Sequence, residues 1–183
     1  KRQINPHFLF NMLNNANVLI KKNPAEASQL LFKLEDLLRY QINNGSEDKV
    51  SLSSDIHFLN DFLNLEKIRR DKFEYTISKE GEIEKISLPP LLFIPFVENA
   101  VKHNPDSENE SYVHLSFKVW KNELLFQCIN SKPARQSEED KPKVGGLGLK
   151  NIKRRLELLY PGKHTLEVEE TEVSYKVNLH LTL

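Results

Sequence analysis

The stretch PFVENAVKHN occupies residues 95–104, and it separates apolar from polar side chains at helical spacing. We predict a helix over 89–103 that continues through Pro95. The side chains expected to face the core are Val97, Ala100 and Val101. The side chains expected on the opposite face, three and four residues apart, are Asn99, Lys102 and His103. The stretch therefore predicts an amphipathic helix with one face buried in the core and polar side chains available for binding or catalysis on the other.

The polar face of this helix suits a phosphate ligand with a hard cation. The amide oxygen of Asn99 can ligate Mg²⁺, which prefers oxygen. Lys102 and His103 can meet phosphate oxygens. Glu98 can accept a proton or bind a metal-bound water. An amphipathic helix with a solvated face is the alternative for this segment taken alone.

Further along the chain, residues 145–152 read GGLGLKNI and lead into a predicted helix over 148–160. Glycines let a backbone approach an anion closely, and a helix N-terminus supplies unpaired N–H groups. A flexible loop before a helix is the alternative. The phosphate-binding pattern GxxxxGK[ST] is absent, and Asn151 breaks the dinucleotide pattern GxGxxG.

At the other end of the chain, residues 3–11 read QINPHFLFN within a helix predicted over 1–22. His7 falls on a polar stripe with Asn11, opposite an apolar stripe made by Leu9, Met12, Ala16 and Ile20. An exposed imidazole held on a helix is a competent nucleophile, and an idle surface histidine is the alternative. Pro6 either kinks a helix that is already running or starts one that Asn5 caps.

The remaining pattern predicts an α+β chain with one mixed, mainly antiparallel sheet and helices on one face. The further helices expected are 24–43, opened by Asn23-Pro24, and 53–71. The strands expected are 73–78, 112–120, 123–130, 164–170 and 173–182, with turns at Glu80-Gly81 and Lys121-Asn122 and a polar loop over 131–144. We predict a domain boundary after residue 49, with a helical domain over 1–49 and a mixed domain over 50–183.

Composition excludes several classes of protein. Lys+Arg and Asp+Glu are 26 each, so the chain has no excess of basic residues. This balance argues against a protein that binds nucleic acid directly. The one cysteine, Cys128, excludes an internal disulfide and a four-cysteine zinc site. No apolar run reaches the roughly 20 residues of a membrane span. The chain starts without Met inside a helical pattern, so we expect a piece of a longer protein whose other part could cross a membrane.

Together and in this order, the three segments resemble the LytS/YehU-type sensor histidine kinases, whose catalytic half is of the GHKL ATPase type. QINPHFLFN is similar to that family's H-box, PFVENAVKHN to its N-box, and GGLGLKNIKRRLELLYP to its G2 box. The linking stretches LLRY at 37–40 and LEKIR at 65–69 resemble its signatures as well. The resemblance implies a helical dimerisation and phosphotransfer segment over 1–49 and a Bergerat-type α/β sandwich over 50–183.

The resemblance also implies roles for single residues. His7 would be the phosphoacceptor, Asn99 would hold Mg²⁺ between the phosphates, and Glu98 would be a base or a partner of the metal's water shell. Lys102 and His103 would touch phosphates. The residues implied beside the nucleotide and its lid over 131–145 are Gly146, Leu147, Gly148 and Leu149. The implied ligands are ATP and Mg²⁺.

Two departures from the family pattern concern the reaction. The first glycine box usually carries an Asp that bonds the adenine amino group, and here Cys128-Ile129-Asn130-Ser131 stands in its place without the glycines. The amide oxygen of Asn130 can still accept that bond. An acid follows the phosphoacceptor in many other histidine kinases, whereas Phe8 follows here. The base for His7 is therefore unassigned, with Glu98 as one candidate, and Asn11 is a candidate to position a water for dephosphorylation.

The function expected is ATP-dependent autophosphorylation of His7 and transfer to an aspartate of a response regulator, with the LytTR DNA-binding type as the candidate regulator. Apolar stripes on the first two helices favour a homodimer. By the family's pattern the chain would be the cytoplasmic portion of a bacterial inner-membrane protein. The alternatives are a degenerate nucleotide-binding or scaffold module, another GHKL enzyme such as a serine kinase or chaperone-type ATPase, and a structural interaction protein.

Overall fold

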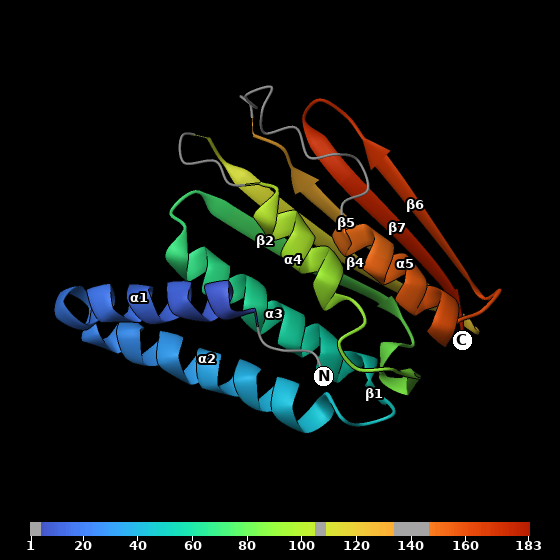
Figure 1. Cartoon of the computed structure of the whole chain (residues 1–183), viewed down its shortest axis with the longest axis horizontal. Helices are drawn as coiled ribbons and strands as arrows, with labels where there is room; N and C mark the ends of the chain where they lie inside the picture. Colours follow the sequence, from blue (N-terminus) through green and yellow to red (C-terminus); the bar gives the residue numbers. More distant parts are fainter. Residues whose placement is uncertain (1–4, 105–108, 134–146) are drawn as a thin grey trace. The chain divides into compact units, whose positions relative to one another are not determined.

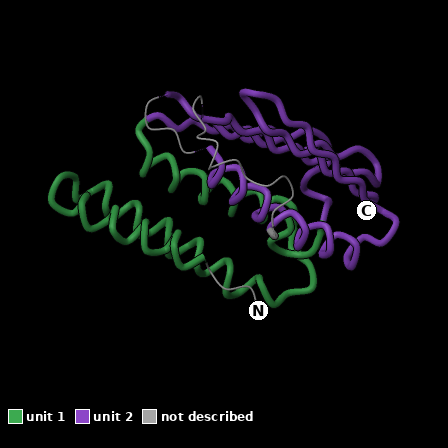
Figure 2. Tube along the Cα trace, turned by 45° about the horizontal axis from the view of Figure 1, so that its top comes forward, with its two compact units in different colours: residues 1–71, 87–92 green, residues 72–86, 93–183 purple. Residues whose placement is uncertain are grey.

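The computed structural model describes residues 5–104, 109–133 and 147–183 (Figure 1). The chain divides into two compact units, one of residues 1–71 with 87–92 and one of residues 72–86 with 93–183 (Figure 2). The first unit therefore extends past residue 49, because the third helix packs with the first two. The predicted domain boundary after residue 49 stays a prediction.

Unit 1 is a group of three helices with a two-stranded ladder. Its elements are α1 (Pro6–Lys22), α2 (Pro24–Asn44), β1 (Val50–Ser51), α3 (Leu52–Arg69) and β3 (Ser87–Leu88). The core side chains are Phe8, Met12 and Ala16 from α1, Ala27, Leu30, Leu34 and Leu37 from α2, and Ile56, Leu59, Phe62 and Leu63 from α3. This spacing of three and four residues gives α1 and α2 one buried stripe each, whereas α3 is also buried on its other faces, at Leu52, Phe58 and Leu65.

Asparagine side chains set the ends of the first two helices. Oδ1 of Asn5 accepts hydrogen bonds from the backbone N–H of His7 at 3.1 Å and of Phe8 at 3.5 Å, and Pro6 takes the first helical position. Asn5 therefore caps and Pro6 starts the helix, which decides between the two alternatives of the sequence. Asn23 ends α1 with its N–H and caps α2 with its side chain, which accepts from the N–H of Glu26 at 3.2 Å.

Unit 2 is a five-stranded sheet with two helices on one face (Figure 1). Its strands are β2 (Phe73–Gly81), β4 (Ser111–Trp120), β5 (Glu123–Ser131), β6 (His164–Glu170) and β7 (Ser174–Thr182), in the order β2-β4-β5-β7-β6. β2 pairs with β4 in parallel, and the other pairs are antiparallel. The helices are α4 (Ile94–Lys102), α5 (Leu147–Leu159) and the short 3-10 turn η1 (Ile83–Lys85). The α+β class with a mixed, mainly antiparallel sheet is confirmed.

A cluster of phenylalanine rings fixes α4 on the sheet. Phe93 and Phe96, at the start of α4, lie 4.7 and 5.6 Å from the ring of Phe126 on β5. Phe117, opposite Phe126 in the register of β4 and β5, makes an edge contact with Phe93 at 5.2 Å. Aromatic rings in such offset and edge arrangements contribute about 0.5–1.5 kcal/mol per pair beyond the area they bury. The buried face of α4 is thereby held, and its polar face is left for other contacts.

Three predictions about local structure are wrong. The helix predicted over 89–103 begins only at Ile94, because Pro95 occupies the first turn and Leu91 adopts a positive φ of 56°. The turn expected at Glu80-Gly81 lies inside β2, which continues to Gly81. Ile20 does not join the buried stripe of α1, since it is 52% exposed. Within the described residues, no helix is both long and apolar enough to cross a membrane.

Candidate functional site

In unit 2, Asn99 on α4 meets the first turn of α5. A Cβ atom placed on Gly148 would lie 3.3 Å from Oδ1 and 3.4 Å from Nδ2 of Asn99. The backbone of α5 can approach the amide of Asn99 this closely because residue 148 has no side chain. The structure thus brings together two of the predicted site residues that lie far apart in the sequence.

Lys102 and His103 lie at the C-terminal end of α4, and both are exposed. His103 ends the helix, and its N–H donates to the carbonyl oxygen of Asn99 at 3.0 Å. Partial desolvation of the ring, followed by the charge of Lys102, lowers the pKa of His103 below its ordinary value of 6.5. A phosphate could contact both side chains. The negative charge of the phosphate would favour the protonated ring of His103, which could then donate a hydrogen bond beside the ammonium group of Lys102.

Two further polar residues of this stretch are half-buried or buried. Glu98 is half-buried on α4, one position before Asn99. Asn104 is buried, and its Nδ2 donates to the carbonyl oxygen of Tyr112 at 3.0 Å. Asn104 therefore ties the end of α4 to the start of β4. We assigned it no role from the sequence, although a polar residue directly after a helix is a recognised stop signal.

Asn130 lies near the end of β5 on the face of the sheet that the helices cover, as do Phe126 and Cys128. It is buried, and its Nδ2 donates to the carbonyl oxygen of Ser131 at 2.9 Å. A carbonyl oxygen only accepts, so this bond fixes the orientation of the amide and leaves Oδ1 as its acceptor. The hydroxyl of Ser131 in turn accepts from the N–H of Tyr112 at 2.9 Å.

The segment predicted to cover the nucleotide is only partly described. Gly146 and the predicted lid from residue 134 onward lie outside the described residues, and only the backbone of Leu147 is described. Leu149 is half-buried in the first turn of α5. The exposed N-terminal turn of α5 carries N–H groups that an anion can bind.

In unit 1, His7 is exposed on the first turn of α1. Nδ1 of His7 lies 3.3 Å from Nδ2 of Asn11, one helical turn further on. Phe8 points to the core instead, where its ring stacks on Phe62 with the centroids 4.8 Å apart. The position after the histidine therefore serves packing, and Asn11 lies beside the imidazole of His7.

These residues divide between the two units. His7 and Asn11 are in unit 1, and Glu98, Asn99, Asn130 and Gly148 are in unit 2. In the described ranges, no three His, Cys, Asp or Glu side chains gather into a metal site. The amide oxygen of Asn99 is a ligand that a hard cation such as Mg²⁺ can use.

Comparison with known proteins relates the whole chain to sensor kinases. Residues 1–73 match the family model described as histidine kinase. The sensor histidine kinase YpdA of Escherichia coli (strain K12) is 30% identical over 96% of this chain and 33% of its own length. The sensor protein LytS of Staphylococcus haemolyticus is 26% identical over 98% of this chain and 32% of its own length. The chain thus spans about a third of the length of these curated relatives.

Solved structures show the same fold. The histidine kinase domain of the blue-light activated histidine kinase EL346 of Erythrobacter litoralis has a TM-score of 0.55 and 14% identity, over 97% of this chain and 93% of that one. Histidine kinase ThkA, in its complex with the response regulator protein TrrA, has a TM-score of 0.52 and 15% identity, over 96% of this chain and 59% of that one. Residues 1–73 thus match the histidine kinase family, and nearly the whole chain is similar in sequence to sensor kinases of the LytS and YpdA type.

Proposed function

We propose that the chain is the kinase core of a two-component sensor, which transfers the γ-phosphoryl group of ATP to His7. The contact between Asn99 and Gly148 carries the proposal, because it joins the polar face of α4 to the N-terminal turn of α5. The helix N-terminus suits phosphate, and the amide suits the cation that accompanies it. The family relationship supports the same assignment. In functional terms, residues 1–49 would be the phosphotransfer and dimerisation segment and 50–183 the ATP-binding domain.

The proposed step is an in-line displacement at phosphorus. A lone pair on Nε2 of His7 attacks the γ-phosphorus, an N–P bond forms, and the bond to the bridging β–γ oxygen breaks so that ADP leaves. Asn11 can support this step by rotating its amide, because its oxygen would then accept from Nδ1–H and leave the lone pair on Nε2. Glu98 stays the candidate to take a proton, and Asn11 stays the candidate to position a water for dephosphorylation.

The residues of unit 2 fit ATP with Mg²⁺. Mg²⁺, when bound, neutralises charge on the phosphates, and the amide oxygen of Asn99 would help to hold it. Lys102 and His103 would contact phosphate oxygens. Asn130 would accept from the adenine amino group through Oδ1, since its nitrogen is committed to Ser131. The residues proposed to surround the nucleotide from α5 and the preceding loop are Gly146, Leu147, Gly148 and Leu149.

The partner proposed for the second step is a response regulator. An aspartate oxygen would form a bond to phosphorus while the N–P bond to His7 breaks. The similarity to ThkA, solved with the response regulator TrrA, supports this class of partner. The regulator proposed is of the LytTR DNA-binding type, so the chain itself needs no contact with nucleic acid. We further propose that the chain is the cytoplasmic portion of a bacterial membrane sensor.

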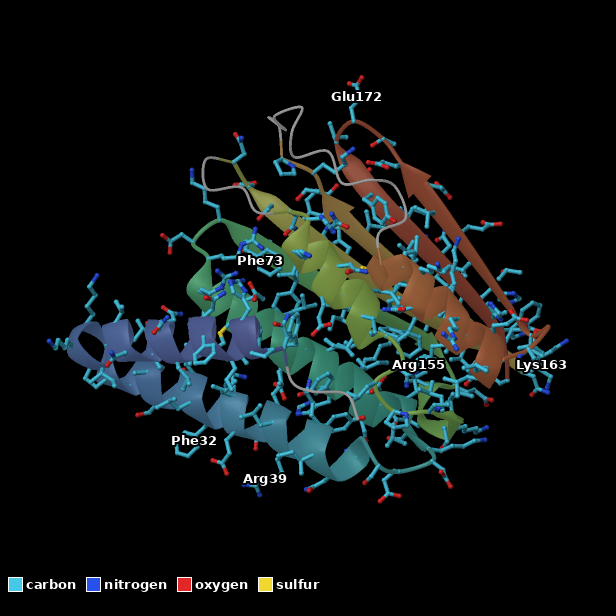
Figure 3. All side chains as sticks on the ribbon, viewed as in Figure 1. Phe32, Arg39, Phe73, Arg155, Lys163 and Glu172 are labelled. Atoms are coloured by element: carbon cyan, nitrogen blue, oxygen red, sulfur yellow. The ribbon has the colours of Figure 1, made fainter. Side chains whose placement is uncertain are left out.

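We also propose that unit 1 forms a homodimer through its outer apolar side chains. The exposed apolar residues of α1 and α2 are Phe10, Leu13, Val18, Ile20, Leu31, Phe32 and Ile42. Phe32 is 67% exposed and projects away from α2 (Figure 3). Seven exposed apolar side chains on two adjacent helices favour burial against a second copy of the chain.

The test is incubation of the chain with Mg²⁺ and γ-labelled ATP, with the variants His7→Ala and Asn99→Ala and the matched control His57→Ala. His57 is an exposed histidine on α3. We expect acid-labile label in the wild type and in His57→Ala, and none in the other two. Acid-stable label would indicate a kinase of hydroxyl groups. An absence of label while ATP still raises the melting temperature would indicate a nucleotide-binding module.

A further inference from the structure

Asp55 on α3 is fully buried and joins two segments that are distant in sequence. Its Oδ1 accepts a hydrogen bond from the hydroxyl of Tyr40 on α2 at 3.2 Å. The same oxygen accepts from the backbone N–H of Leu91 at 3.0 Å. A buried carboxyl group destabilises the fold unless hydrogen-bond donors satisfy it. The hydrogen bonds from Tyr40 and from Leu91 therefore stabilise Asp55 in its buried position.

Tyr40 is held for this contact by packing as well. Its ring stacks on Phe58 of α3 with the centroids 4.9 Å apart and an interplanar angle of 23°. α2 and α3 run side by side here (Figure 1). Burial of the phenol and the charge of Asp55 both raise the pKa of Tyr40, so the hydroxyl keeps its proton and stays a donor.

The segment 87–92 is the part of the chain that Asp55 secures. It belongs to unit 1, although the residues before and after it belong to unit 2. Ser87 and Leu88 pair with Ser51 and Val50 in the ladder of β1 and β3. Leu91 has a φ of 56°, which a leucine rarely adopts, and such a conformation persists only where its surroundings hold it. The hydrogen bond from its N–H to Asp55 is one such restraint.

The segment 87–92 leads directly into α4, the helix that carries Asn99. Leu92 is the last residue of unit 1, and Phe93, the next residue, is the N-cap of α4. The polypeptide that carries Asn99 therefore leaves unit 1 two residues after the bond to Asp55. On the other side, Tyr40 is on α2, the helix that packs against the phosphoacceptor helix α1.

We infer that Tyr40 and Asp55 are positioning residues for phosphoryl transfer. They would couple α1 and α2, the helices that carry and support His7, to the segment 87–92 that leads into α4. The inference rests on the proposed kinase function. The hydrogen bond and the ring contact of Tyr40 are with Asp55 and Phe58, so its effect on phosphoryl transfer would pass through Asp55 and Leu91. Loss of the hydroxyl would loosen the restraint on Leu91 and leave α4 itself intact.

The test uses Tyr40→Phe in the whole chain, because this variant keeps the ring stacked on Phe58 and removes only the hydroxyl. The matched control is Tyr112→Phe, whose ring stacks on His114 in the sheet of unit 2. Three quantities are measured: hydrogen exchange of the peptide that contains Leu91, the Kd for an ATP analogue, and the rate of labelling from ATP. In Tyr40→Phe we expect exchange at least fivefold faster, a Kd within twofold of wild type, and labelling slowed at least threefold.

The control should match the wild type in all three quantities. A labelled wild type with an unchanged labelling rate in Tyr40→Phe would overturn the inference and leave the proposed function standing. A rate that falls only in proportion to a weakened Kd or a lost folded fraction would also overturn it, because that pattern reports damage to the fold. A wild type without label would overturn the proposed function and this inference with it.

Discussion

The first turn of α5 approaches Asn99 so closely that a Cβ at Gly148 would meet the amide of Asn99 at 3.3 Å. Contacts of this length are tighter than most Cβ contacts, so an added methyl group must move the amide of Asn99. Glycine at position 148 is therefore favoured for a steric reason, in addition to the suitability of a glycine-rich helix start for binding phosphate. It follows that the chemistry of Asn99 is sensitive to a change on a different helix.

Gly148→Ala should weaken ATP binding about tenfold without lowering the stability of the fold. Alanine is favoured over glycine in a helix by up to about 1 kcal/mol, which offsets the cost of moving one side-chain amide. Affinity is measured by titration calorimetry with an ATP analogue, and stability by urea unfolding. In an Asn99→Ala background the same change should have no further effect on affinity. Equal additive losses in both backgrounds would contradict the steric account.

Asn130→Asp should destabilise the fold at pH 7 by about 1–3 kcal/mol, because a carboxylate oxygen would replace the donor that faces the carbonyl of Ser131. Burial raises the pKa of the introduced carboxyl in the folded state. The protonated form can donate, so the destabilisation should shrink as the pH falls towards 4. Urea unfolding at several pH values measures this. Asn122→Asp in the exposed turn between β4 and β5 is the control, and a similar loss there would contradict the prediction.

The pKa of His103 predicts how nucleotide binding depends on pH. The folded state lowers this pKa, so as the pH falls the unfolded chain takes up the proton first. The group therefore favours folding above an unfolded pKa of about 6.5 and favours it less below that pH. If the ring contacts phosphate, a bound ATP analogue should raise the pKa, which NMR titration of the ring measures. The control is His180, which is exposed on β7 and should show no change when the analogue binds. An unchanged titration of His103 would mean that this residue is not part of the nucleotide site.

Cys128 should be inert in the native chain. Burial raises the pKa of its thiol to about 12, so almost no thiolate is present at pH 8. The thiol should react with iodoacetamide only through unfolding, at a rate that urea accelerates steeply. Since the chain has one cysteine, mass spectrometry of the intact chain reads this reaction directly. Rapid modification in native buffer would mean that the covered face of β5 opens locally.

Much of the fold could be predicted from the sequence where neighbouring residues decide it. The Asn23-Pro24 pair sets the start of α2, and the turn at Lys121-Asn122 joins β4 to β5 as expected, whereas for α1 the sequence left two alternatives open. Lys121 has a φ of 54°, which suits such a tight turn. For α2 and for this turn the deciding residues lie within a few positions of the feature, so local pattern was sufficient.

The features that could not be predicted depend on distant partners. The conformation of Leu91, which delays the start of α4, is held by Asp55 on another helix. The parallel pairing of β2 with β4 and the contact of Gly148 with Asn99 likewise join residues far apart in sequence. The sequence placed Asn99 and Gly148 in separate motifs. Their approach follows from how α4 and α5 pack on the sheet, which no local pattern contains.

Peptide mapping at neutral pH tests most directly whether His7 is the phosphoacceptor. The chain has six histidines, so the label could in principle occupy any of them. After incubation with Mg²⁺ and ATP, the chain would be digested and its phosphopeptides sequenced by mass spectrometry without acid. We predict phosphate on His7 within the peptide that spans the start of α1. Phosphate on another histidine, or on a serine or threonine, would contradict the account.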